Sequence, residues 1–96
     1  MSIAQIPTVQ APGWNAFRAR VIAAITDVEV LMQQLGRGIN AEVMTEEVAE
    51  HLGMELTTPE AYEALLQLVR ATRPIAQESL RVTREQQGGQ YSLLLL

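Results

Sequence analysis

The clearest pattern in this chain of 96 residues is the segment WNAFRARVIAAITDVEVLMQQL, which runs from Trp14 to Leu35. Its apolar residues follow the a/d alternation of a heptad repeat, and two more widen the stripe at the e position. Residues with this spacing share one face of a helix about 32 Å long. The pattern predicts a helix whose apolar face needs a partner helix, and that face consists of Trp14, Phe17, Val21, Ala24, Ile25, Val28, Leu31, Met32 and Leu35.

The overall composition also favours packed helices. Hydrophobic residues make up 48% of the chain, but only 4% of the residues are aromatic and none is cysteine. A core of Ala, Leu, Val, Ile and Met suits helix-on-helix packing better than a sandwich or a barrel. The absence of cysteine excludes disulfides, thiolate metal sites and a cysteine nucleophile. We expect an all-α fold, either an antiparallel helical hairpin or a three-helix arrangement, with an extended N-terminal arm and a short apolar C-terminal tail.

Glycine, proline and capping residues set the expected boundaries. Gly36 and Gly53 can end helices in the left-handed conformation, and Asn40 and Thr58 are good N-caps, the latter followed by Pro59 in the first helical position. These signals predict an arm at residues 1–13 and a helical domain at 14–87, with helices at about 14–35, 40–52 and 59–87.

Two later signals predict interruptions. Pro74 lies inside the third helical pattern, where it removes a backbone hydrogen bond, so we expect a kink or break near Arg73. Gly88-Gly89 indicates a hinge, after which residues 88–96 form an apolar tail that leaves the helix.

Charge is segregated along the chain. The net charge is −4, all basic residues are arginine, and the acidic stretch 42–63 contains no arginine, whereas four arginines follow between positions 70 and 84. This arrangement favours head-to-tail attraction between copies, or simply two solvated helix faces. No basic stripe or long apolar run is present, so we predict no nucleic-acid partner and no membrane span, with cytosolic synthesis as the default.

Residue patterns for catalysis are weak. Glu47 and His51 have the i, i+4 spacing of metal ligands, but a surface histidine among glutamates is the commoner outcome. No serine lies in a Gly-x-Ser-x-Gly context, and a chain without lysine cannot contain a phosphate-binding P-loop. We therefore predict that the protein is not an enzyme and binds no metal and no cofactor.

Both ends of the sequence contain apolar residues, which are stable only when they are buried against other apolar groups. In the arm, Ile3, Ile6 and Val9 recur every third residue, as on one side of a polyproline-like strand. The terminal leucines would be an aggregation liability if bare, so the tail either folds back on its own core or docks on another chain. The predicted partner-binding residues are Ile3, Ile6, Val9, Trp14, Phe17, Tyr91, Leu93, Leu94, Leu95 and Leu96.

The ending Gly88-Gly89-Gln90-Tyr91-Ser92-Leu93-Leu94 resembles the Gly-Gly-x-x-Ser-Leu ends of small virion proteins from short-tailed bacteriophages. This resemblance implies a non-enzymatic accessory part of the tail, portal region or ejection apparatus. It would place the protein in a virion after its synthesis.

A second resemblance is to the inner rod subunit of type III secretion systems. It depends on Met1-Ser2-Ile3-Ala4, on Thr57-Thr58-Pro59 at the start of a long C-terminal helix, and on Thr83-Arg84 and Leu93-Leu94 farther along. We expect a structural subunit of a larger assembly, homo-oligomeric and docking through its arm and tail. The phage component is the first candidate, the secretion rod the second, and a homodimeric helical adaptor or regulator, zipped through residues 14–35, the third.

Overall fold

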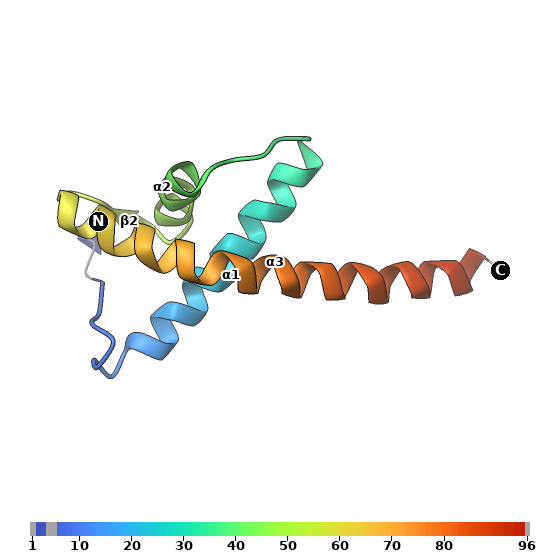
Figure 1. Ribbon diagram of the computed structural model, residues 1–96, viewed down its shortest axis with the longest axis horizontal. Coiled ribbons are helices and arrows are strands. Elements are labelled where there is room, and N and C mark those ends of the chain that lie inside the picture. The colour runs from blue at the N-terminus through green and yellow to red at the C-terminus, as the bar shows by residue number, and fades with distance from the viewer. Residues whose placement is uncertain (1, 4–5, 96) are drawn as a thin grey trace.

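Three helices form the protein in a computed structural model, which describes residues 2–3 and 6–95, with side chains described for residues 6–86. Helix α1 spans Trp14–Gln34, α2 spans Ala41–His51 and α3 spans Pro59–Leu95. Two short strands, β1 (Ser2–Ile3) and β2 (Met54–Glu55), complete the fold. The all-α class is therefore confirmed. The molecule measures 54 × 29 × 23 Å because α3 extends well past the other helices (Figure 1).

The predicted capping residues determine the helix ends. Gly36 has φ +67°, and after it Arg37 N donates to Met32 O at 2.9 Å, which closes a Schellman motif at the end of α1. Gly53, with φ +68°, ends α2 in a similar way. The side chain of Asn40 accepts a hydrogen bond from Val43 N at 2.8 Å, and that of Thr58 accepts one from Ala61 N at 3.1 Å. Local capping chemistry thus fixes where the helices begin and end.

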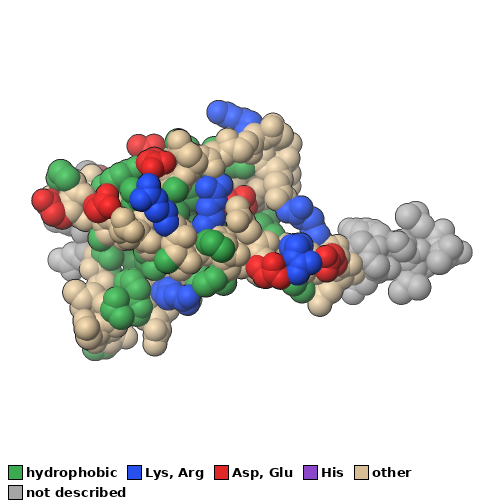
Figure 2. Space-filling view, viewed as in Figure 1, with side chains coloured by type: hydrophobic (Ala, Val, Ile, Leu, Met, Phe, Trp, Pro, Cys, Tyr) green, Lys and Arg blue, Asp and Glu red, His purple; other side chains and the backbone are tan. Residues whose placement is uncertain are grey.

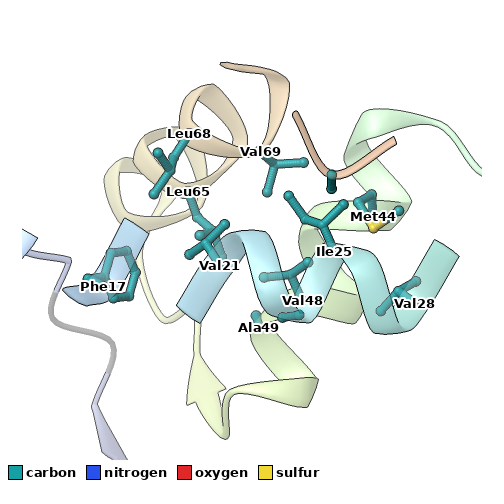
Figure 3. Packing of buried hydrophobic residues seen from close by; sticks show 12 residues of the cluster. Phe17, Val21, Ile25, Val28, Met44, Val48, Ala49, Leu65, Leu68 and Val69 are labelled. Atoms are coloured by element: carbon teal, nitrogen blue, oxygen red, sulfur yellow. The ribbon is translucent and has the colours of Figure 1, made fainter. Parts of the chain in front are cut away.

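The core lies where all three helices meet. The heptad face of α1 supplies its centre, and Figure 3 shows Val21 and Ile25 directed between the side chains of α2 and α3. Burying side chains of this size contributes roughly 1.5–3 kcal/mol each. The core cluster consists of Phe17, Val21, Ala24, Ile25, Val28, Met44, Val48, Ala49, Leu65, Leu68, Val69 and Ala76.

Two buried threonines are accommodated within the helices that carry them. Thr45 Oγ1 donates to Ala41 O at 2.8 Å, and Thr72 Oγ1 donates to Leu68 O at 2.7 Å. Both side chains are almost fully buried, so these bonds remove the cost of desolvating a hydroxyl. Among the described residues no buried side-chain nitrogen or oxygen is left without a partner.

The N-terminal arm folds onto the body of its own chain. Ser2 and Ile3 pair in parallel register with Met54 and Glu55. Farther along, Ala11 N donates to Thr8 O at 2.9 Å, and this turn leads into α1. Sequence alone did not predict this strand pair, because each strand is only two residues long.

The antiparallel hairpin is not the arrangement observed. Helices α1 and α3 cross obliquely instead of lying along one another (Figure 1). Glu29 on α1 contacts both Arg73 and Gln77 on α3, which locates the crossing near the middle of α3. Since crossed helices diverge on either side of their contact, the last turns of α1 move away from α3.

Helix α3 is longer than predicted. It continues without a break through Pro74 and through Gly88-Gly89 to Leu95, so the predicted break and hinge are not observed. Pro74 is exposed, so the carbonyl of Arg70, which loses its backbone donor, lies where water can reach it. Glycine lowers helix propensity by about 1 kcal/mol but is not incompatible with helical φ and ψ.

Candidate protein-interaction surface

A hollow with apolar groups on both of its walls lies where α1 and α3 diverge. It has a volume of about 480 Å³ and is lined by the end of α1 and by α3 beyond the crossing. Two apolar residues, Val30 and Leu80, come from opposite walls. We call this hollow the wedge groove, and define it by Val30, Gln33, Gln34, Leu80, Thr83 and Arg84.

The end of α1 is the least covered part of the heptad face. The repeat is buried as far as Val28, which is 5% exposed, but Leu31 is 48% exposed and Leu35 is 57% exposed. Val30, beside them on the wedge groove, is 39% exposed. Met32 in the same turn packs against the core, so the helices of this chain cover that turn only on one side.

We define the distal part of α3 as residues 77–95. No described side chain in it is buried, and Thr83 and Arg84 border the wedge groove opposite the end of α1. All described side chains from 81 to 86 are exposed, and Leu80 is half-buried at the edge of the core. Figure 1 shows this part of the helix extending alone beyond the body. Helical segments without tertiary contacts are only marginally stable in water. This stretch of α3 therefore lacks the packing that stabilises the rest of the helix.

Charged side chains on the distal helix neutralise one another. Arg81 donates to Glu78 at 2.5 Å and to Glu85 at 2.6 Å, an alternation of sign that is visible in Figure 2. The hydrogen bond from Arg81, and then its positive charge, lower the pKa of Glu78 below its usual value. Arg81 and Glu85 stand four positions apart, the spacing at which opposite charges meet on one face of a helix.

Two more of the rear arginines have partners within the chain. Arg70 pairs with Glu42 at 2.9 Å, and Arg73 pairs with Glu29 at 2.7 Å. The first of these pairs joins a rear arginine to the acidic stretch 42–63, whereas the second joins one to α1. The fold therefore neutralises the acidic stretch at one position and leaves its other glutamates on the surface.

A second hollow separates α1 from α2. It is lined by Asp27, Val28, Leu31, Glu47, Glu50 and His51. His51 Nε2 lies 3.1 Å from Asp27 Oδ2, a partner that sequence reasoning missed because 24 positions separate the two residues. Among the described residues, no group of three acidic, histidine or cysteine side chains is arranged to hold a metal ion.

The outer face of α2 and of the first turns of α3 is acidic. Partial desolvation, followed by the charges of Glu46, Glu42 and Glu63, raises the pKa of Tyr62. A shallow hollow beside it is lined by Pro59, Glu60, Glu63, Ala64 and Gln67. Two copies of this face would repel one another.

The predicted partner-binding residues occupy several different environments. Phe17 is 8% exposed and belongs to the core, and Ile6 and Trp14 are partly buried against that core. Val9 is 67% exposed. Ile3 lies in β1 and Tyr91, Leu93, Leu94 and Leu95 lie in α3, but their side chains are outside the described set, as is all of Leu96.

Sequence reasoning did not identify Val30 and Leu80 as surface residues. Leu80 follows the helical pattern of the core, and Val30 lies beside the heptad stripe. The sequence did contain one signal, length, because the third helical pattern, predicted at about 59–87, is longer than the first, at about 14–35.

Fold and surface together define a small three-helix protein with an uncovered helix end. No helix in the described part of the chain is both long and apolar enough to cross a membrane. Comparison with protein families, curated proteins and solved structures finds no match to this chain.

Proposed function

We propose that this protein is a non-enzymatic structural subunit of a larger protein assembly, docking through the wedge groove and the distal part of α3. One observation carries the proposal: a helix of 37 residues extends past its own core, beside exposed apolar residues of α1. A partner that covers this region would bury Val30 and Leu80 and stabilise the distal turns.

The sequence of the last turns supports this role. Tyr91, Leu93, Leu94, Leu95 and Leu96 give the end of the chain an apolar composition. Apolar groups at the end of an extended helix suit insertion into a groove on another protein. We propose that these residues anchor the subunit. The arm has a smaller role, because β1 already pairs with β2.

The first candidate assembly is a short-tailed bacteriophage virion, in which the protein would be an accessory component of the tail, the portal region or the capsid. Its support is the resemblance of the segment from Gly88 to Leu94 to the ends of such virion proteins. In this proposal the protein is made in the bacterial cytoplasm and then incorporated into the particle.

The second candidate is an inner-rod-like subunit of a type III secretion apparatus. One specific observation favours it: α3 is continuous through Pro74 and Gly88-Gly89, as a packed rod helix requires. A homodimeric adaptor zipped through α1 has less support, because the heptad face of α1 up to Val28 packs against α2 and α3.

Particle incorporation tests the proposed function. Assemblies would be purified from the organism that encodes the chain, and the protein quantified by mass spectrometry relative to the other subunits. We expect a fixed ratio in the particle, and recovery of a chain lacking residues 91–96 only in the low-mass fraction. The exposed Glu60→Gln should be incorporated like the wild type.

Normal incorporation of the shortened chain, or absence of the wild-type chain from any large particle, would contradict the proposal. The neighbouring genes distinguish the two candidate assemblies. Portal and tail genes would support the virion, whereas export-apparatus genes would support the rod.

A further inference from the structure

We propose that the first partner in the wedge groove is a second copy of this chain, whose α3 lies antiparallel in the groove, so that two molecules form a closed two-fold pair. This inference deepens the proposed function, since it identifies one partner of the same surface. The location of the groove, the length of α3 and the charge of its distal turns all favour this partner.

The position of the groove makes it self-complementary. One wall of the wedge groove is α3 itself, through Leu80, Thr83 and Arg84, and the same helix continues outward to Leu95. If the α3 of a second molecule packs antiparallel along this wall, the wedge groove of the second molecule faces the distal turns of α3 in the first molecule. Each copy then binds the distal turns of the other copy's α3 in its own wedge groove, so both copies use the same surface, as a two-fold interface requires.

The length of α3 fits this geometry. From Leu80 to Leu95 the helix rises about 22 Å, or roughly four turns. This stretch is long enough to pass the wedge groove of a partner and to lie beside the end of its α1, where Val30 is 39% exposed. The pairing would therefore cover the apolar groups of both walls of the groove, Val30 and Leu80.

The neutral charge of the distal part of α3 favours self-association through this part of the surface. The described distal segment contains Glu78, Arg81, Arg84 and Glu85, so its formal charge is zero. The four excess negative charges of the chain lie elsewhere, and the acidic face around Tyr62 would oppose a second copy. Two molecules can thus approach through α3 without the like-charge repulsion that other faces impose.

Sedimentation equilibrium of the full chain over a range of concentrations tests the pair. We expect a monomer–dimer equilibrium, with Thr83→Glu and Leu80→Glu each raising the dissociation constant about tenfold or more. Thr83 is exposed, so its replacement should leave the fold intact, as circular dichroism can verify. The matched control is Ile75→Glu, because Ile75 is 45% exposed on α3 but does not line the groove.

Spin labels test the antiparallel orientation. The chain has no cysteine, so single cysteines can be introduced and labelled without further changes. Labels at Thr83→Cys should lie close across the pair, and labels at Glu60→Cys should lie much farther apart. Equally short distances at both positions would indicate a parallel pair and would overturn the proposal.

Other outcomes are equally decisive. A monomer at every concentration, growth beyond the dimer, or equal weakening by Ile75→Glu and Thr83→Glu would each overturn the closed pair. A monomer that is still incorporated into particles would leave the proposed function intact. A dimer that enters no particle would retain the pair and contradict the proposed function.

Discussion

Arg73 on α3 donates through Nε to Oε1 of Glu29 on α1 across 2.7 Å, and the two side chains are only 20% and 12% exposed. A second guanidinium nitrogen, Nη2, donates to the carbonyl oxygen of Ile39 at 2.8 Å, in the connection between α1 and α2. One arginine thus joins two helices and a loop at the point where α1 crosses α3. This contact fixes the crossing and therefore the wedge groove beyond it.

Replacing Arg73 should destabilise the fold. Arg73→Ala leaves the largely buried carboxylate of Glu29 with only the 3.5 Å contact from Gln77 and removes the side-chain donor to the carbonyl of Ile39, at a cost of about 1–3 kcal/mol in the free energy of unfolding. Urea denaturation followed by circular dichroism measures this cost. The control is Arg70→Ala, because its ion pair with Glu42 is about half exposed and should contribute less than about 1 kcal/mol. Equal losses in both variants would show that Arg73 is not a special contact.

The heptad face of α1 should be energetically uneven. Ile25 is fully buried, so Ile25→Ala should lower the free energy of unfolding by about 2–5 kcal/mol. Leu35 is 57% exposed, and Leu35→Ala should change stability by less than about 0.5 kcal/mol in the dilute monomer. Thermal and urea unfolding of both variants measure the difference. A large loss for Leu35→Ala in a monomer would mean that the last turn of α1 belongs to the core.

Pro74 should weaken the helix that it occupies. Pro74→Ala restores the backbone donor to Arg70 O on an exposed face, so we expect stability to rise by about 1–3 kcal/mol. Pro59→Ala is the matched control, because a proline in the first helical position removes no helical hydrogen bond. A loss of stability in Pro74→Ala would indicate that the proline ring makes a contact of its own.

Acid should loosen the distal part of α3. The pKa of Glu78 is lowered in the folded state by the hydrogen bond from Arg81. Stabilisation from this group is therefore present above the pKa of the unfolded state, and it is lost as pH falls through the lower folded value. Nuclear magnetic resonance shifts of residues 77–86 should move towards coil as pH falls through the lowered folded pKa of Glu78. The variant Glu78→Gln should already show this loss at neutral pH, and an unchanged acid profile in that variant would contradict the assignment.

Local chemistry made much of the fold predictable. Gly36, Asn40, Gly53 and Thr58 form the caps that their residue types indicate, and the heptad of α1 correctly predicts its buried face as far as Val28. These features depend on neighbours within a few positions, which a single sequence contains.

Features that depend on contacts between distant residues were not predictable. Glu29 and Arg73 are 44 positions apart, and the crossing that they fix decides which apolar residues lose their cover. Pro74 and Gly88-Gly89 were overestimated as breaks, because their cost is set by exposure and packing and not by residue type alone. The wedge groove results from the crossing angle, so no local pattern predicts it.

Amide hydrogen exchange along α3 tests the central claim, that its distal part is an interface completed by association. In dilute monomer, amides at 81–95 should exchange much faster than those at 62–72, which should be slowed to the level set by global unfolding. On association, protection of 81–95 should rise by at least about tenfold, and Thr83→Glu should prevent that rise in the self-association experiment. Distal amides that are as slow as those of the core in the monomer would contradict the account.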